Sequence, residues 1–146
     1  MSPNTRKLQR GSTAVELAIA LPFLVFLMVG AMDFGRAYYH AVTAANAAGT
    51  GAFYGAQSNI SSGHFDQIRA VAREDAKDIG AVTVTADRSC SCPSGTTVNC
   101  ISGACAGYGA PRAYVRTRVV QSFPLMVPYP GVPRPDVGRT AFMRVQ

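Results

Sequence analysis

An uncharged apolar run near the N-terminus constrains this chain more than any other feature. Residues 17–32 contain no charged side chain, and counting back to Ser12 brings the run to the roughly 20 residues that a helix needs to cross a bilayer. The residues that precede it include the cations Arg6, Lys7 and Arg10. The run therefore predicts a membrane-spanning helix, with its N-terminal end in the cytoplasm and the rest of the chain on the far side.

A conventional secretory signal peptide is the main alternative for this run. A basic region, an apolar region and the small residues 29–31 before Met32 would suit a signal peptidase. The run is at the long limit for the apolar region of a signal peptide, and Glu16 is unusual at its start. Both features favour a helix that is retained.

Glu16 is the one charged residue in the predicted span. A charge at mid-bilayer costs at least about 2.5 to 3.5 kcal/mol, and less near the surface. Glu16 lies four residues after Ser12, about 6 Å along a helix axis. One interpretation is that its side chain reaches the headgroups, and the other is that a cation is brought to it.

A cut between Gly11 and Ser12 would create such a cation. The new α-amine would be largely protonated at neutral pH. An amine on a neighbouring chain, about 4 Å from the carboxylate, would gain roughly 4 kcal/mol at an effective dielectric near 20. That gain offsets the insertion cost, so the carboxylate would set the register in which one helix docks beside another.

These residues resemble the class III signal of type IV pilins and pseudopilins, in which a basic leader precedes Gly11, Ser12 and Glu16 and an apolar helix follows. A narrower resemblance, to TadE-like pseudopilins of the tight-adherence (Flp, type IVc) pilus system, covers the run GSTAVELAIALPFLVFLMVGAMDFGRAYY. The shared features are the basic leader, the Glu within small residues, the early Pro22, and a Gly-Arg pair with Tyr after the helix. The strand-like phrases AYVRTRVV and TAFMRV are similar to the strand pair that ends many TadE-like chains.

The resemblance implies a pilin-like fold and a role as a minor pilin or pseudopilin in pilus assembly. It implies cleavage after Gly11 by a prepilin peptidase and helix packing that uses Glu16. The implied partners are that peptidase, other Tad pseudopilins, the Flp major pilin, the inner-membrane assembly platform and membrane lipid. The implied location is the bacterial inner membrane, with a single pass and a periplasmic or extracytoplasmic C-terminal domain, or the pilus itself.

The chain is predicted to contain a basic leader over residues 1–11, a long helix over residues 12–56 and a small α+β domain over residues 57–146. The helix would span the membrane at about 14–34 and continue outside it. Pro22 lacks a backbone donor and clashes with the preceding turn, which predicts a kink. Spacings of three and four predict one small-residue stripe, which would face another backbone or the chain's own domain: Tyr38, Ala41, Ala45, Ala48 and Ala52.

The C-terminal part has the patterns of an α+β domain with a small antiparallel sheet. Residues 64–79 predict an amphipathic helix, with its apolar side formed by Phe65, Ile68, Ala72, Ala76 and Ile79. Gly80 is placed to end it. Alternation predicts strands at 81–86, 113–123 and 137–145, and the last two would pair as a hairpin around a proline-rich turn. In the strand at 113–123, Val115, Thr117, Val119 and Phe123 would lie on one side, and Arg116 and Arg118 on the other.

Four cysteines, Cys90, Cys92, Cys100 and Cys105, lie in a loop predicted at residues 88–111. Three pairings are open. A zinc site of four thiolates is the alternative, but the C-x2-C hooks typical of such sites are missing. Outside the membrane, two disulfides are the simpler outcome.

Charge and motifs favour a non-enzymatic membrane protein. Half of the net charge of +6 comes from the leader, so the remaining bias predicts no nucleic-acid binding. We find none of the common catalytic motifs, and His40 and His64 have no partner at ligand spacing, so no cofactor or metal is expected. The competing hypotheses are a membrane-anchored binding or adhesion protein outside any pilus and, ranked last, a secreted enzyme.

Overall fold

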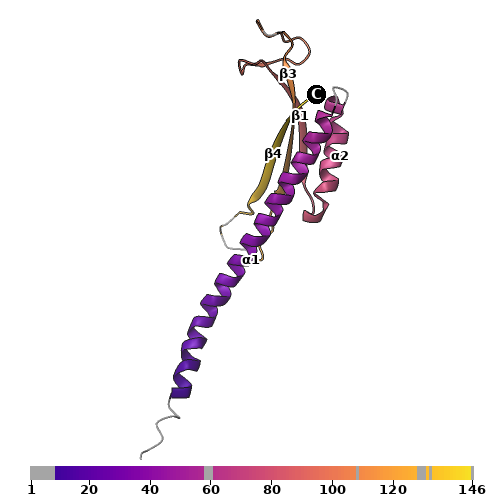
Figure 1. The fold of residues 1–146 in the computed structure, drawn as a ribbon. Coiled ribbons are helices and arrows are strands. Elements are labelled where there is room, and N and C mark those ends of the chain that lie inside the picture. Colours follow the sequence, from indigo (N-terminus) through magenta and orange to yellow (C-terminus); the bar gives the residue numbers. More distant parts are fainter. Residues whose placement is uncertain (1–8, 58–60, 108, 128–130, 132, 146) are drawn as a thin grey trace, which may run out of the picture. The chain divides into compact units, whose positions relative to one another are not determined.

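The computed structural model describes most of the chain, namely residues 9–57, 61–107, 109–127, 131 and 133–145. The helices are α1 (Gln9–Ala56) and α2 (Phe65–Asp75), with short 3-10 turns at Ser61–Gly63 and Lys77–Ile79. The strands are β1 (Thr83–Ser91), β2 (Thr97–Val98), β3 (Arg112–Ser122) and β4 (Asp136–Arg144). Figure 1 shows the helices and the longer strands. The chain divides after Arg36 into two compact units.

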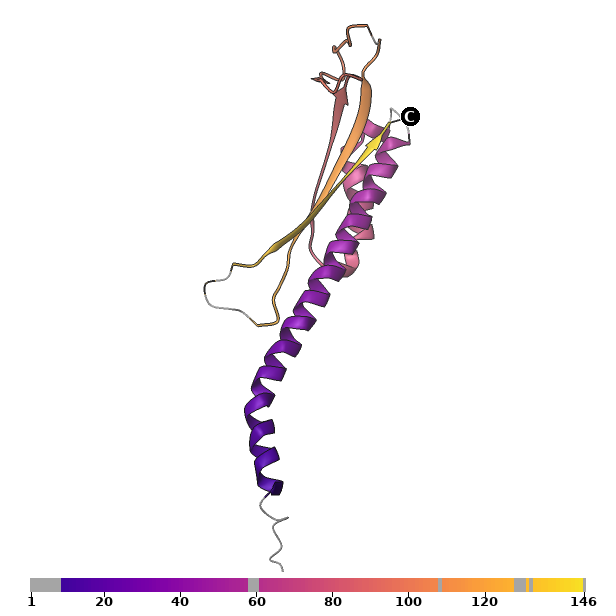
Figure 2. The ribbon, with the colours of Figure 1, turned by 60° about the vertical axis from the view of Figure 1, so that its left-hand side comes forward.

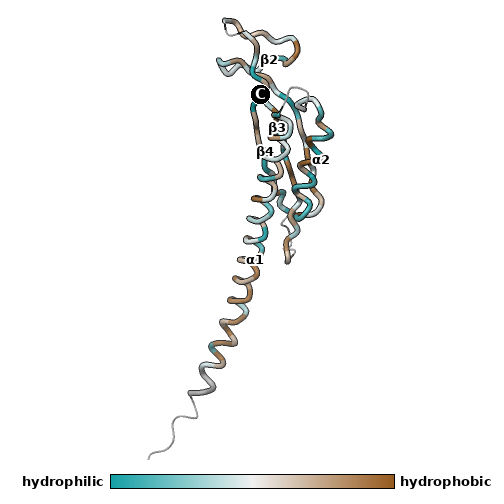
Figure 3. Tube along the Cα trace, turned by 45° about the vertical axis from the view of Figure 1, so that its right-hand side comes forward, coloured by the Kyte–Doolittle hydropathy of each residue, from teal (hydrophilic) through white to brown (hydrophobic). Residues whose placement is uncertain are grey.

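The first unit contains the beginning of α1, whose large apolar side chains are exposed on every side. Those from Val15 to Met28 are 51–74% exposed, and Figure 3 shows this stretch as mostly hydrophobic. α1 is assigned as one continuous helix through Pro22, so the local melting that a proline can cause is not seen. A bend at Pro22 stays a prediction.

The second unit is built on a four-stranded antiparallel sheet in the order β2-β1-β3-β4. The C-terminal part of α1 and α2 cover one face of this sheet (Figure 2). The α+β class predicted from the sequence is confirmed, including the hairpin of β3 and β4, whose register pairs Thr117 with Ala141. Part of the predicted proline-rich turn between them, residues 128–130 and 132, lies outside the described residues.

Alternation along β3 decides which face of the sheet is buried. Val115, Thr117 and Val119 are completely buried, whereas Arg116 and Arg118 are exposed. In the larger core cluster, Val119 and Val84 lie with alanines of α1 and α2 and with Ile79. The predicted pattern of this strand is therefore confirmed.

The predicted small-residue stripe on α1 is wrong in part. Ala48 and Ala52 are buried as expected, but Tyr38 and Ala45 are exposed, and the buried row also includes Ala44. Alanine occurs on several sides of this part of the helix, so composition does not show which side faces the sheet. The buried alanines face the chain's own domain and not another backbone, which was one of the two predicted alternatives.

Two glycines show where α1 comes closest to that domain. A Cβ on Gly55 would lie 2.7 Å from Ile68 Cδ1 and 2.9 Å from Val115 Cγ1, and one on Gly51 would lie 3.0 Å from Ala72 Cβ. No side chain fits at Gly55 without displacing its neighbours. The absence of a Cβ therefore lets α1 pack directly on α2 and β3.

The second helix forms but ends at Asp75, four residues before the predicted end, and one strand is longer than predicted. α2 buries Ile68 and Ala72, and the following 3-10 turn ends at Gly80 with φ +88°. β1 runs to Ser91 instead of ending at Ala86. Because β3 continues to pair with it as far as Arg112, the first residues of the predicted loop 88–111 are strand, and β2 lies within the same stretch.

A buried polar contact joins three elements of the second unit. Gln121 Oε1 lies 2.5 Å from His40 Nδ1, and Gln121 Nε2 donates to the carbonyl of Ile79. The His40 ring meets Phe123 edge to face, with centroids 5.2 Å apart. His40 therefore has a structural role between α1 and β3.

Candidate functional site

The predicted processing and assembly residues lie together at the start of α1. Gly11, Ser12 and Glu16 fall within the first turns of the helix, which begins at Gln9. Ser12 and Glu16 are four residues apart, so about 6 Å of helix axis separates them. The side chains of residues 9–12 lie outside what the structure describes, and cleavage after Gly11 stays a prediction.

Glu16 lies on an exposed, almost entirely apolar surface. It is exposed itself, and its neighbours Val15 and Leu17 are 60% and 58% exposed. No other ionisable residue lies between Ser12 and Met32. A positive group that meets this carboxylate at the same depth in a membrane would therefore come from outside residues 13–32.

The helix around Glu16 is a candidate membrane span, which fits a single-pass membrane protein. A helix that is apolar on all sides is stable when lipid or protein surrounds it. Helical backbone also satisfies its own hydrogen bonds, as the hydrocarbon region requires. Past the uncharged run, Arg36 Nη1 lies 3.4 Å from Asp33 Oδ1, and such charges suit the membrane boundary.

The four cysteines form two disulfides, which confirms the preferred of the two interpretations. Cys90 pairs with Cys100 and Cys92 pairs with Cys105. The two bridges interleave along the sequence. They tie the end of β1 to the segment after β2, a region with few buried apolar residues.

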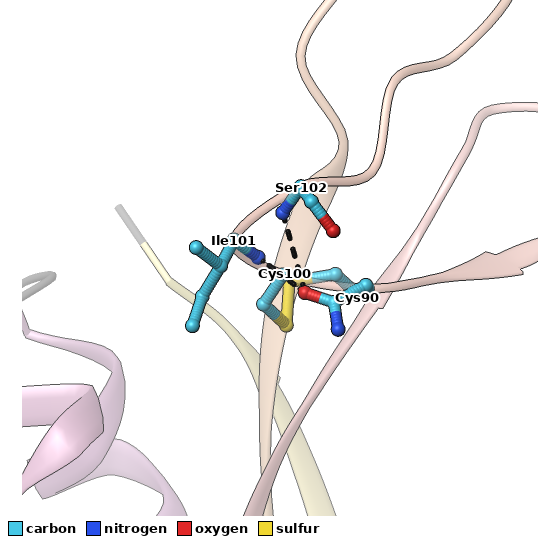
Figure 4. The surroundings of a disulfide bond; sticks show 5 residues. Cys90, Cys100, Ile101 and Ser102 are labelled. Atoms are coloured by element: carbon cyan, nitrogen blue, oxygen red, sulfur yellow. Dashed lines mark hydrogen bonds between the residues drawn. A yellow bond between two sulfur atoms is a disulfide. The ribbon is translucent and has the colours of Figure 1, made fainter.

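A turn beside the first bridge presents one large apolar side chain to solvent. Asn99 Oδ1 accepts hydrogen bonds from the backbone N–H groups of Ile101 and Ser102, at 2.8 and 3.3 Å. Figure 4 shows this turn next to the bridge between Cys90 and Cys100. The Ile101 side chain is 98% exposed.

A depression on the other face of the sheet was not predicted from the sequence. It has a volume of about 360 Å³ and is lined by Thr85, Arg116, Arg118, Thr140 and Phe142. The alternation of β3 did place Arg116 and Arg118 on the polar side. Their neighbours on β1 and β4 depend on the strand register, which no local pattern specifies.

The N-terminal segment is similar to a known protein family. Residues 11–52 match the family model of the TadE-like proteins. The matched range contains Gly11, Ser12, Glu16 and Pro22, and it extends into the part of α1 that packs on the sheet. No curated protein and no solved structure matches the chain.

Proposed function

We propose that this protein is a membrane-anchored minor pilin or pseudopilin. The match of residues 11–52 to the TadE-like family model supports this proposal, because it implies a Tad pilus-associated protein with an N-terminal apolar helix. In this proposal a prepilin peptidase cuts between Gly11 and Ser12, and the mature chain joins or primes a Tad (Flp) pilus. The observation that carries the proposal is one carboxylate, Glu16, one helical turn beyond the cut in a helix with exposed apolar side chains on every side.

The proposed mechanism is lateral docking of apolar helices. Cleavage exposes the α-amine of Ser12, and the amine of one chain pairs with Glu16 of its neighbour. At about 4 Å and an effective dielectric near 20, the pair gains roughly 4 kcal/mol. Apolar side chains do not by themselves specify how far one helix is shifted along another, whereas a single charge pair does.

The proposed topology follows from the charge distribution. Arg6, Lys7 and Arg10 precede the span and keep the leader in the cytoplasm, where the peptidase and the assembly platform would meet it. The second unit then lies on the periplasmic side. Two disulfides suit an oxidising compartment, which supports this orientation.

The mass of the mature chain tests the proposed processing. We expect protein extracted from membranes to begin at Ser12. Gly11→Leu should leave the full-length precursor, because a large side chain would obstruct the peptidase at the cut. Gly30→Leu is the matched control: no atom lies within 4 Å of a Cβ at Gly30, so this variant should be processed normally.

Other N-terminal masses would contradict the proposal. A chain that begins at Met32 would indicate a secretory signal peptide, and an intact leader would indicate a membrane tether, as in a binding or adhesion protein outside the pilus. If the Gly11→Leu variant were shortened normally, the cut between Gly11 and Ser12 would be wrong.

A further inference from the structure

The face of the sheet that points away from α1 and α2 carries an aligned set of polar and aromatic side chains. In the antiparallel register, Thr85, Arg118 and Thr140 lie opposite one another on β1, β3 and β4. The next row places Phe142 opposite Arg116. Directly paired residues have Cβ atoms about 4.5–5.5 Å apart, so these five side chains surround one depression of about 360 Å³.

Positive charge is in excess in this depression. Two guanidinium groups and no carboxylate line it. Arg116 Nε donates to Asp87 Oδ1 at 2.9 Å, which balances one of the two charges. Arg118 forms no ion pair within the described part of the chain. The planar guanidinium of Arg118 therefore offers a fork that matches a carboxylate.

The other side chains suit a ring with hydroxyl groups. Phe142 is 62% exposed, so one apolar surface is available to the C–H face of a ring, and covering it removes apolar area from water. Each hydroxyl of Thr85 and Thr140 can donate one hydrogen bond and accept others. They flank Arg118 on both sides.

We propose that this depression binds a hexuronic acid unit of an acidic polysaccharide. The carboxylate pairs with Arg118, the ring hydroxyls bond to Thr85 and Thr140, and the C–H face of the sugar covers Phe142. The volume lies within the range of about 300–1,000 Å³ in which small-molecule sites occur. A neutral sugar has no carboxylate to pair with Arg118. The site should therefore prefer the acidic sugar over the neutral one.

A single-stranded nucleic acid fits the same surface less well. Binding of that kind uses successive aromatic rings with a basic groove along the backbone. Here one aromatic ring and one guanidinium without an ion-pair partner line the depression. The proposed site lies entirely in the second unit, so it depends neither on leader cleavage nor on Glu16.

Titration of the full-length protein in detergent tests the site. We expect oligomers of glucuronic acid to bind, and neutral glucose oligomers of the same length to bind at least about tenfold more weakly, because the interaction with a charged group is lost. Arg118→Gln should raise the Kd for the acidic oligomer about tenfold or more. Arg118→Lys keeps the charge but loses the forked guanidinium. Its Kd should lie between that of the unmodified chain and that of Arg118→Gln. Phe142→Ala should also weaken binding.

Arg139→Gln is the matched control. Arg139 is an exposed arginine on β4, but its place in the register is on the opposite face from Phe142. The control should keep the Kd of the unmodified chain. If Arg139→Gln lost as much affinity for the acidic oligomer as Arg118→Gln, the binding would depend on the overall charge of the protein. That result would overturn the proposal.

Three further results would overturn it: no binding of the acidic oligomer, equal binding of the neutral one, or tighter binding of single-stranded DNA at the same arginine. Raising the salt concentration should weaken the acidic oligomer but not abolish its preference over the neutral one, because contacts with Phe142 and the threonines are not screened.

Discussion

The two portions of α1 differ in what surrounds them, although both belong to one continuous helix. In the first unit, large apolar residues are exposed on all sides of the helix. In the second, a row of alanines and glycines is buried against α2 and the sheet. Large exposed side chains need cover from lipid or a neighbouring chain, whereas small ones let the chain's own backbone come close. Side-chain size therefore separates the anchoring portion from the packing portion.

The largest effect is expected where a side chain is added to the packed portion. Gly55→Leu puts bulk where even a Cβ would lie 2.7 Å from Ile68 Cδ1, so overpacking should cost the second unit about 3 kcal/mol. A thermal melt of the detergent-solubilised protein, followed by near-ultraviolet circular dichroism of its tyrosines, measures the loss.

The same substitution in the anchoring portion provides the comparison. Gly30→Leu meets no atom within 4 Å and should leave the melting temperature unchanged. If the two variants melted alike, the distinction between the two portions of α1 would be wrong.

A smaller loss is expected when one disulfide is removed. Cys90→Ser combined with Cys100→Ser opens a loop with a sequence separation of 10, and loop-closure entropy predicts a cost of about 2.7 kcal/mol. The loss should appear in the melting of the second unit, while the fraction of protein in the membrane stays the same. A change in membrane insertion would show that the two units depend on each other.

The smallest effect is expected at an exposed ion pair on the second unit. The hydrogen bond from Lys77, and secondarily its charge, lowers the pKa of Glu74, and Glu74 likewise raises the pKa of Lys77. Because the pKa of Glu74 is lowered, the pair stabilises the fold at a pH above the pKa that Glu74 has in the unfolded chain. This stabilisation is lost as the pH falls through the lowered pKa. Because the pKa of Lys77 is raised, the pair stabilises the fold at a pH below the pKa that Lys77 has in the unfolded chain. This stabilisation is lost as the pH rises through the raised pKa.

The pair is therefore complete at neutral pH, yet water and salt screen it. We expect Lys77→Gln to leave the melting temperature at pH 7 unchanged. A clear drop would mean that this exposed ion pair contributes more to the free energy of unfolding than its exposure to water suggests.

The sequence predicted the elements with a strong local pattern. The uncharged run predicts the anchoring portion of α1, and alternation predicts the inward Val115 and Val119 of β3. Local patterns did not predict the end of β1, because residues 88–91 lack apolar alternation and are held as strand by β3 and by the bridges of Cys90 and Cys92.

Two features depend on how distant residues meet, so the sequence alone does not give them. The cysteines allowed three pairings, and the structure has the interleaved one. The depression beside Phe142 requires β4 to pair with β3 in one register. A shift of one residue would place Phe142 on the other face.

In the proposed function, the position of the Glu16 carboxylate, and not its charge alone, directs assembly. The most direct test is co-purification of pilus components with three forms of the protein: the unmodified chain, Glu16→Ala, and Glu16→Ala combined with Ala20→Glu, which keeps one carboxylate but moves it by four residues. We predict that all three insert in the membrane and that only the unmodified chain retains the pilus components. Retention by either variant would contradict the claim.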